Sequence, residues 1–348
     1  KNKNHKFIVF LKEKPQLNLP KETTNFKYYV FGPKKLWTQF ALPVKLTIGP
    51  KIDVFFSTAH YGPRFSKVPY VVTIHDLSYL HFPELFKKND LMQLTNWSKY
   101  SIEKSTHIIA PSQSTKEDII KNYNVPASKI SVTYEGYDQA RFKPQSKSKV
   151  ESVKSKYKIG GDYILFVGTL QPRKNIERLI EAYANLSKGR TSSFGRGTTL
   201  SGVGLVIAGK KGWLYDSIFE KVKELKLQDK VIFTDFVRDD DLPALISGAK
   251  VYVNPSLWEG FGIPVIEAQA CGVPVVVSNT SSLPEIVGNS ALTFDPTNVK
   301  DIESAIIVML TDEKLRSVFT KKGQENIKRF SWEKCAQETI KVLEKAKN

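Results

Sequence analysis

The stretch "KVYVNPSLWEGFGIPVIEAQACGVPVVVSN", residues 250–279, decides the fold because it reads as a strand, a glycine-rich loop, a helix and a second strand. Pro264 suits the first turn of that helix, where its missing N–H leaves no hydrogen bond unmade. We therefore expect the helix to begin near Ile263. Short apolar runs that alternate with helices are typical of parallel α/β sheets.

The same alternation extends over most of the chain and falls into two sets of strands. In the first set the expected strands are "KFIVFL", "VFFST", "YVVTIHD", "HIIAPS" and "ISVTYEG". In the second set they are "YILFVGTL", "GVGLVIAGK", "KVIFTDFV", "KVYVNPS" and "GVPVVVSN". Helices are expected at "DLMQLTNWSKYSIEKS", "QSTKEDIIKNY" and "IERLIEAYANL". The predicted fold class is α/β, with two doubly wound, Rossmann-like domains that hold a ligand at the carboxyl ends of their strands.

A chain of 348 residues is longer than one hydrophobic core usually serves, so the two sets are assigned to two domains. The first is expected over residues 1–150 and the second over 151–330, with a polar boundary segment at 137–157. A closing helix over 331–348, with Ser331 as its N-cap, is expected to pack back on the first domain. Residues 188–204, rich in Gly, Ser and Thr, are interpreted as a surface insertion.

Composition excludes several classes of protein. With 41% hydrophobic and 25% charged residues, the chain has the composition of a globular protein. Two cysteines, Cys271 and Cys335, do not make a disulfide framework, which favours a reduced compartment. No apolar run approaches the roughly 20 residues that a membrane-spanning helix needs. The predicted location is cytoplasmic, and peripheral on the inner face of the cell membrane.

The net charge of +17 is concentrated in the first half of the chain. Residues 1–150 contain 24 Lys and Arg against 11 Asp and Glu, and the remaining residues 28 against 24. A positive half suits a phosphorylated ligand, an anionic membrane surface or nucleic acid, and a solvated basic face without a partner explains it equally well. Nucleic acid is not expected as a partner, because the sequence has neither an aromatic-spaced RNA-binding motif nor zinc-finger spacing.

Two loops of the second half are candidates for anion binding. "FVGTLQPRKN" places Gly168, Arg173 and Lys174 after a strand, an arrangement that suits a diphosphate. Positive charges at the start of the next helix are unfavourable to its dipole. A bound anion therefore explains Arg173 and Lys174 better than a basic segment without a ligand does. The helix start at Ile263 offers a second anion site through its free N–H groups.

The glutamates in "EGFGIPVIE" complete the predicted ligand. Gly260 and Gly262 leave room for a ligand to approach the backbone. Glu267, expected within the first turn of the helix, suits the vicinal hydroxyls of a ribose, and Glu259 suits the hydroxyls of a second ring. Each glutamate alone has a plainer explanation, as a helix-dipole partner or a solvated loop residue. A ribose, a diphosphate and a second ring together describe a nucleotide sugar.

These motifs resemble those of the retaining group 1 glycosyltransferases of the GT-B fold, a large bacterial family that includes cell-envelope mannosyltransferases. The resemblance covers most of residues 50–300 and lies in "AHYGPRFSKVPYVVTIHDLSYLHFPE", "APSQSTKEDIIKNY", "FVGTLQPRKNIERLIEAY", "LVIAGKKGW" and "EGFGIPVIEAQACGVPVVVSNTSSLPEIVG". It implies that Glu267 binds the ribose, that Lys174 binds the diphosphate, and that Glu259 lies near the transferred sugar. It also implies further donor contacts from His75, from the backbone of Gly260, Phe261 and Gly262, and from Phe236 and Val237 near the base.

Two departures from the family pattern affect what the resemblance implies. Thr169 stands where many relatives have an arginine, and Arg173 is expected to supply that charge. Relatives also begin with a strand and a glycine-rich loop that border the donor phosphates, and nothing before "HKFIVFL" matches them.

The predicted activity is transfer of a hexose, with retention at the anomeric carbon, from a nucleoside-diphosphate sugar to a glycan or polyprenyl-linked glycan. GDP-mannose is the preferred donor, with a UDP-glucose-type glucosyltransferase or a nucleotide-sugar-binding protein as alternatives. No cofactor or metal is expected, because the two cations already neutralise the leaving diphosphate. If the two glutamates were the catalytic pair of a glycosidase, Arg173 and Lys174 would have no role. A dinucleotide-dependent oxidoreductase is not expected either, because no Gly-x-Gly-x-x-Gly motif follows a strand.

Overall fold

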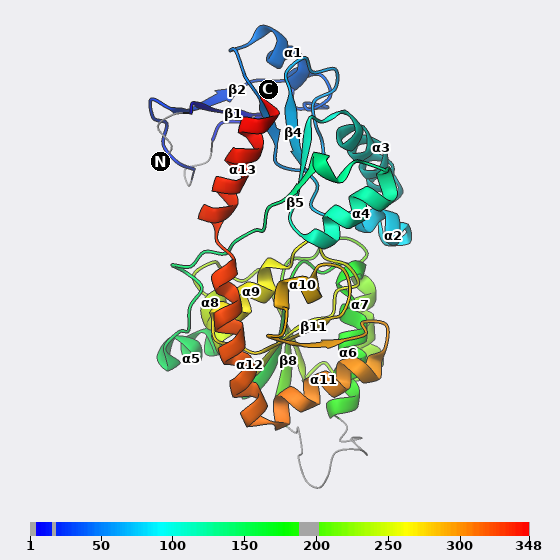
Figure 1. The fold of residues 1–348 in the computed structure, drawn as a ribbon. Helices are drawn as coiled ribbons and strands as arrows, with labels where there is room; N and C mark the ends of the chain where they lie inside the picture. Colours follow the sequence, from blue (N-terminus) through cyan, green and yellow to red (C-terminus); the bar gives the residue numbers. More distant parts are fainter. Residues whose placement is uncertain (1–4, 16–18, 188–201, 348) are drawn as a thin grey trace.

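The computed structural model describes residues 5–15, 19–187 and 202–347. The described residues form three parallel sheets, and the two larger ones lie one above the other (Figure 1). The segment 188–204, expected as an insertion, lies outside the described residues except for its last three. Every pairing between the named strands is parallel. The predicted α/β class with two Rossmann-like domains is confirmed.

The first domain is built on a four-stranded sheet of order β3-β4-β5-β6. Its strands are β3 (Phe55–Ser57), β4 (Tyr70–Thr73), β5 (His107–Ala110) and β6 (Ile130–Val132). Its helices are α1 (Ala41–Ile48), α2 (Ser78–His81), α3 (Lys88–Lys104) and α4 (Gln113–Tyr123), with 3-10 turns η1 (Pro83–Leu85) and η2 (Ala127–Lys129). The central strands β4 and β5 are almost wholly buried, as expected for a sheet covered on both faces.

A separate two-stranded sheet of the first domain precedes these strands in the chain. β1 (Phe7–Leu11) pairs in parallel with β2 (Phe26–Val30). β1 is predicted from the sequence, but β2 and α1 are not. β2 is short and mostly exposed, so its apolar pattern is weak.

The second domain has a six-stranded sheet of order β12-β11-β10-β7-β8-β9. Its strands are β7 (Asp162–Val167), β8 (Val203–Ala208), β9 (Val231–Asp235), β10 (Val251–Asn254), β11 (Val275–Ser278) and β12 (Leu292–Phe294). Its helices are α5 (Lys147–Lys156), α6 (Ile176–Ser187), α7 (Asp216–Glu224), α8 (Leu242–Ser247), α9 (Ile263–Ala270), α10 (Leu283–Val287), α11 (Val299–Thr311) and α12 (Glu313–Asn326), with 3-10 turns η3 (Pro172–Lys174) and η4 (Ile327–Arg329). Two hydrophobic clusters, on opposite faces of the sheet, form its core.

The expected polar boundary at 137–157 is partly helical. α5 occupies residues 147–156 and packs on α8 through the buried side chain of Val153. Lysines and serines dominate the sequence of α5, which is why its two valines, of which only Val153 is buried, do not indicate a helix.

The last helix, α13 (Trp332–Ala346), leaves the second domain and lies along the first (Figure 1). The Ser331 side chain accepts a hydrogen bond from the N–H of Lys334 at 3.1 Å, so the predicted N-cap is confirmed. Val342 and Ala346 pack on Val71 and Ile109 of the first sheet. Among the helices of the described residues, none has both the length and the apolarity that crossing a membrane requires.

Candidate active site

The loops after β7 and β10 bring three charged side chains together, because these strands are neighbours in the second sheet. Lys174, at the end of η3, places its Nζ 2.5 Å from Oε1 of Glu259. The Nη1 of Arg173 lies 3.4 Å from Oε2 of the same carboxylate and donates a hydrogen bond to the carbonyl of Trp258. The two predicted cations therefore meet one of the two predicted glutamates.

Glu259 is held in place by neighbours on every side. It is 8% exposed, its Oε1 accepts a hydrogen bond from Ser256 Oγ at 2.7 Å, and its N–H donates to Ser281 Oγ at 2.9 Å. Burial alone would raise the pKa of Glu259, but the charges of Lys174 and Arg173 hold it below the ordinary value. The carboxylate stays ionised and fixes both cations.

Helix α9 begins at Ile263, as predicted, directly after this loop. Gly262 precedes it in a left-handed conformation, with φ of 104°, which favours glycine. No side chain caps this end, so the positive end of the helix dipole is directed at the loop that carries Glu259. Two sources of positive potential, the helix end and the Arg173–Lys174 pair, therefore flank the same loop.

Glu267 lies in the second turn of α9, so the expectation that it belongs to the first turn is wrong. The helix starts at Ile263, and a residue four positions later is already beyond the first turn. Burial raises the pKa of Glu267 to about 7, an effect that Arg141 opposes and that Asp138 and Asp239 reinforce. Its carboxyl is thus poised between its neutral and ionised forms near neutral pH.

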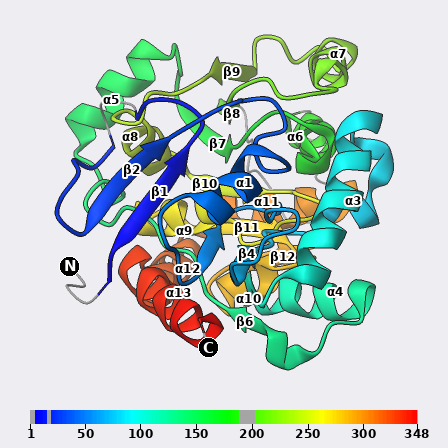
Figure 2. The same cartoon turned by 90° about the horizontal axis from the view of Figure 1, so that it is seen from above.

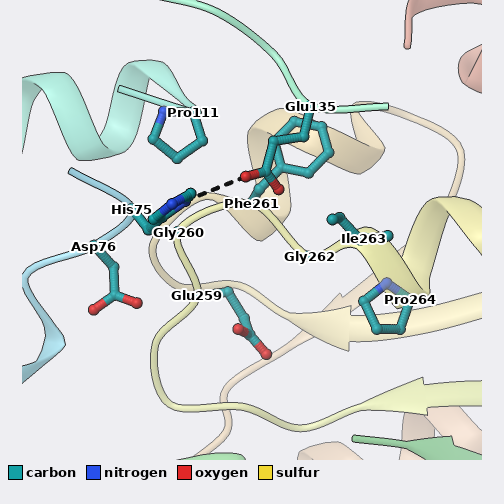
Figure 3. Close-up of a pocket in the computed structure, with 10 residues that line it drawn as sticks. All are labelled: His75, Asp76, Pro111, Glu135, Glu259, Gly260, Phe261, Gly262, Ile263 and Pro264. Carbon is teal, nitrogen blue, oxygen red and sulfur yellow. Dashed lines mark ion pairs between the residues drawn. The ribbon is translucent and has the colours of Figure 1, made fainter. Parts of the chain in front are cut away.

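A cavity of about 230 Å³ lies between the two domains and is shown in Figure 3. The second domain contributes residues 259–264 to its lining, and the first contributes His75, Asp76, Pro111 and Glu135. Pockets for complete small-molecule ligands typically measure about 300–1,000 Å³. The cavity therefore has room for part of a nucleotide sugar, and Glu259 lies at its second-domain side.

His75 faces this cavity with both ring nitrogens engaged by the first domain (Figure 3). Nδ1 lies 3.3 Å from Oε1 of Glu135, and Nε2 lies 3.0 Å from the carbonyl oxygen of Thr58. Because both partners accept hydrogen bonds, they favour the doubly protonated ring, and the hydrogen bond to Glu135 raises the pKa of His75. A ligand that reaches His75 must replace one of these contacts.

The backbone of Gly260 touches the first domain. A Cβ atom at this position would collide with the carbonyl group of His75. Thr115 Oγ1 lies 3.3 Å from the carbonyl oxygen of His75 and 3.4 Å from that of Gly260, and so bridges the two segments. Glycine is required at residue 260 for the domains to approach this closely.

Arg173 and Lys174 do not line the cavity themselves and meet it only through Glu259. Five further predicted donor-binding residues do not line it either: Gly168, Thr169, Phe236, Val237 and Glu267. Thr169 is exposed, and Val237 is buried in the core of the second domain. The ring of Phe236 is exposed but lies 4.4 Å from the Nζ of Lys210, which covers it as a cation–π partner. Gly168 packs closely on Gly209, where a Cβ atom would collide with the Gly168 carbonyl.

Three residues that line the cavity were not singled out from the sequence: Asp76, Pro111 and Glu135. Each follows a strand of the first sheet, after β4, β5 and β6 respectively. The rule that ligands bind at the carboxyl ends of parallel strands, applied to the first set of strands as well as the second, would have found them.

Three further contacts join the domains around the cavity. The carboxylate of Glu285 accepts hydrogen bonds from the N–H groups of Gln113 and Ser114, at 2.8 and 3.0 Å, and from the hydroxyl of Tyr134 at 2.7 Å. It therefore satisfies the free N-terminal N–H groups of α4 from across the cleft. The rings of His81 and Trp258 stack at 3.9 Å, and the indole N–H of Trp213 donates to the carbonyl of Leu85 at 2.8 Å.

In the described part of the chain, no group of three or more His, Cys, Asp or Glu side chains is placed to hold a metal ion. The acidic run Asp239–Asp241 is engaged in ion pairs instead. Asp241 lies 2.5 Å from Lys156 Nζ, and Asp239 lies 3.4 Å from Arg141 Nη1.

Comparison with protein families assigns both halves of the chain to glycosyltransferase models. The model described as "Glycosyl transferases group 1" matches residues 149–326, and that described as "Glycosyltransferase Family 4" matches residues 5–141. The chain is 34% identical to the O-antigen chain mannosyltransferase B of Escherichia coli over 81% of its length and 72% of that protein. It is 32% identical to the O-antigen chain mannosyltransferase RfbU of Salmonella typhimurium over 76% of its length and 67% of that protein.

Solved structures share the fold at lower sequence identity. WaaG, a glycosyltransferase involved in lipopolysaccharide biosynthesis, aligns with a TM-score of 0.75 at 15% identity, over 98% of this chain and 91% of that one. Alr3699/HepE of Anabaena in complex with UDP and glucose aligns with a TM-score of 0.72 at 19% identity, over 92% of this chain and 86% of that one.

Proposed function

The chain belongs to the group 1 glycosyltransferases, and from this premise we propose that it transfers mannose from GDP-mannose to a glycan or polyprenyl-linked glycan in envelope polysaccharide synthesis. The preference for mannose rests on the two relatives named as O-antigen mannosyltransferases. The expected place of work is the inner face of the cell membrane, where a polyprenyl-linked acceptor is held.

One observation carries the proposal: Lys174 and Arg173 converge on Glu259 beside the uncapped end of α9, at the edge of the interdomain cavity. A nucleoside diphosphate that leaves a sugar accumulates negative charge on its phosphate oxygens. Fixed cations and a helix N-terminus stabilise such charge without rearranging during the reaction. The same groups would make a divalent metal unnecessary.

We propose that the reaction retains the configuration of the anomeric carbon. The bond between that carbon and the diphosphate oxygen breaks, and the acceptor hydroxyl attacks from the same face. Its proton passes to the departing phosphate oxygen. Glu259, ionised and buried at the cavity, is assigned to hold the sugar and to stabilise positive charge at the anomeric carbon, without forming a covalent bond to it.

Donor choice is tested by a thermal-shift panel of GDP-mannose, UDP-glucose and ADP-glucose, followed by transfer to a synthetic polyprenyl-linked glycan. We expect GDP-mannose to raise the melting temperature most and to be the donor used. A larger shift with UDP-glucose would make the chain a glucosyltransferase. Donor binding without transfer would favour the alternative of a nucleotide-sugar-binding protein, and no shift with any donor would contradict the proposal.

A further inference from the structure

A row of exposed apolar side chains lies on one side of α1 and the turn that leads into it. Phe40, Val44 and Ile48 are 64%, 57% and 75% exposed, and Leu36, 46% exposed, extends the row. Their spacing of four residues places them on one helical face. The N–H of Phe40 donates to the carbonyl of Leu36 at 3.0 Å, and that of Val44 to the carbonyl of Phe40 at 3.3 Å, so the turn before α1 continues the four-residue hydrogen-bond spacing of the helix, although Leu36, with φ of 52°, is not itself helical.

The opposite side of α1 is also apolar and forms its attachment to the domain. Ala41, Leu42 and Leu46 are buried. A helix at the surface of a water-soluble domain normally places polar residues outward, whereas a helix that is apolar all round is surrounded by apolar material. The domain supplies that material on one side of α1 only. Among the described residues, none covers the outer side formed by Leu36, Phe40, Val44 and Ile48.

The surroundings of this face are positively charged. Residues 27–52 contain five lysines, at positions 27, 34, 35, 45 and 51, and no Asp or Glu. Lys35 and Lys51 are exposed at either end of the row, while Lys45 Nζ lies 4.5 Å from the ring centroid of Tyr29. This segment accounts for part of the positive charge of the first 150 residues.

The position of α1 leaves the face accessible. In Figure 1, α1 lies at the outer end of the first domain, away from the second domain, and Figure 2 looks onto this end from above. The interdomain contacts of Glu285, Trp258 and Trp213 are made elsewhere. Binding at α1 therefore does not require the two domains to separate.

We propose that the outer face of α1 is a membrane-docking surface, which inserts Leu36, Phe40, Val44 and Ile48 into the interfacial region of an anionic bilayer while the neighbouring lysines contact lipid headgroups. An apolar helical face bordered by lysines is the pattern of helices that lie in a membrane interface. An apolar face alone would suit a protein partner equally well. Two of the five lysines are ion-paired with acids outside this segment, Lys34 with Glu13 at 2.9 Å and Lys27 with Glu22 at 3.8 Å. The others, Lys35, Lys45 and Lys51, favour anionic lipid, because negatively charged headgroups attract basic segments.

This inference rests on the proposed function in one respect: the proposed function explains why docking is useful, since docking brings the cleft to a lipid-linked acceptor. Its test needs neither donor nor acceptor, so either idea can fail alone. The whole chain is mixed with vesicles of phosphatidylcholine, with or without roughly one third phosphatidylglycerol, and bound protein is measured by sedimentation. We expect binding to the anionic vesicles, weakened by salt, and little binding to the neutral ones.

Two sets of variants separate the apolar from the electrostatic contribution. The double variant Phe40→Asp, Ile48→Asp is expected to weaken vesicle binding by about tenfold or more, because both insertions are lost. Met92→Asp changes a side chain of α3 that is 62% exposed, and is expected to bind as the unaltered chain does. The pair Lys35→Gln, Lys51→Gln is expected to weaken binding several-fold, whereas Lys147→Gln, Lys149→Gln, an equal charge change on α5, is not.

Melting temperatures of the variants show whether each remains folded. Equal weakening by the α1 variants and by their controls would overturn the proposal, since binding would then depend on net charge alone. Failure of the unaltered chain to bind anionic vesicles would also overturn it. Concentration-dependent dimers that Phe40→Asp, Ile48→Asp abolishes, without any vesicle binding, would instead identify the face as a contact between two copies of the chain.

Discussion

Lys174 and Arg173 share one buried carboxylate, that of Glu259. This shared ion pair fixes the positions of both cations before a ligand binds. The side chains of all three are less than one sixth exposed, so the charges are held with little water around them. Each cation is fixed before a diphosphate arrives, and no side-chain ordering is needed at that moment.

The first prediction concerns Lys174→Ala. It is expected to reduce the rate of sugar transfer by about 10²–10³-fold, because one fixed charge on the leaving diphosphate is lost. Steady-state kinetics with saturating donor measure the effect on kcat. Lys223→Ala removes an exposed lysine of α7 that is not part of the cavity lining, and serves as the control. A kcat close to that of the unaltered chain in Lys174→Ala would contradict the assigned role.

Glu135 is the main cause of the raised pKa of His75. Its hydrogen bond to Nδ1 raises the pKa of His75, so Glu135→Gln is expected to lower it and to make the neutral ring more abundant near neutral pH. An NMR titration of the His75 ring protons measures the change. Glu103→Gln alters an exposed glutamate of α3 and is expected to leave that titration unchanged. If His75 titrates identically in both variants, Glu135 does not act on it.

Glu267 makes the stability of the chain depend on pH. In the unfolded chain a glutamate releases its proton near pH 4.3, whereas burial raises the pKa of folded Glu267 to about 7. Between these values only the unfolded state loses the proton, so the contribution of Glu267 to stability falls as pH rises. Glutamine cannot titrate, so Glu267→Gln removes this decrease in stability with rising pH.

We therefore expect the melting temperature of Glu267→Gln, relative to the unaltered chain, to be a few degrees higher near pH 8 than near pH 5. Glu220→Gln, at an exposed position of α7, is expected to show no such difference. A Glu267→Gln difference that is the same at both pH values would mean that the carboxyl is already ionised at low pH.

At the scale of elements, α4 begins in the first domain but receives part of its cap from α10 of the second. Glu285 accepts hydrogen bonds from the N–H groups of Gln113 and Ser114, while the N-cap Ser112 accepts from Thr115 at 3.1 Å. The cap inside the domain persists when the cleft opens, but the contribution of Glu285 exists only when it is closed.

Glu285→Ala is accordingly expected to favour the open cleft. Loss of a helix cap typically costs about 1 kcal/mol, which would reduce the ratio of closed to open molecules about fivefold. Small-angle scattering is expected to show a larger radius of gyration for this variant. Glu117→Ala removes an exposed acid from α4 itself and is the matched control. An unchanged radius for Glu285→Ala would show that other contacts determine closure.

Which elements the sequence could predict depends on how they are buried. Strands such as β4 and β10 are buried on both faces and appear as continuous apolar runs, so their prediction was straightforward. α1 is apolar on both sides and α5 has one buried position, so neither shows the pattern of an amphipathic helix. β2 and β12 are short and partly exposed, and lack a distinct pattern for the same reason.

At the scale of the whole molecule, the cavity is closed by backbone contact at Gly260. Gly260→Ala is expected to separate the loop from His75 and to lower kcat by about a hundredfold, because reacting groups misplaced by about 1 Å lose that much. Gly160→Ala introduces the same methyl group where no atom lies within 4 Å, and is expected to be active. Full activity of Gly260→Ala would mean that the reaction takes place in a more open form.

The parts of the site that could not be predicted from the sequence depend on contacts between loops that lie far apart in the chain, whether within one domain or between the two. The strand-end rule locates Lys174 and Glu259 within one sheet, and their meeting follows from the adjacency of β7 and β10. The pairing of His75 with Glu135, and of Glu285 with α4, joins residues that no local pattern relates. Such contacts follow only from the folded arrangement.

The path of α13 bears on how motion of the cleft can be observed. The first domain contains β1 near the start of the chain and also receives α13 at its end, where Glu344 lies 3.0 Å from His5. The second domain is thus an uninterrupted insert joined to the first by two connections. Fluorophores attached beside His5 and Glu344 would therefore move together with the first domain, and the distance between them would not change when the cleft opens. One of the two labels has to be placed within the second domain.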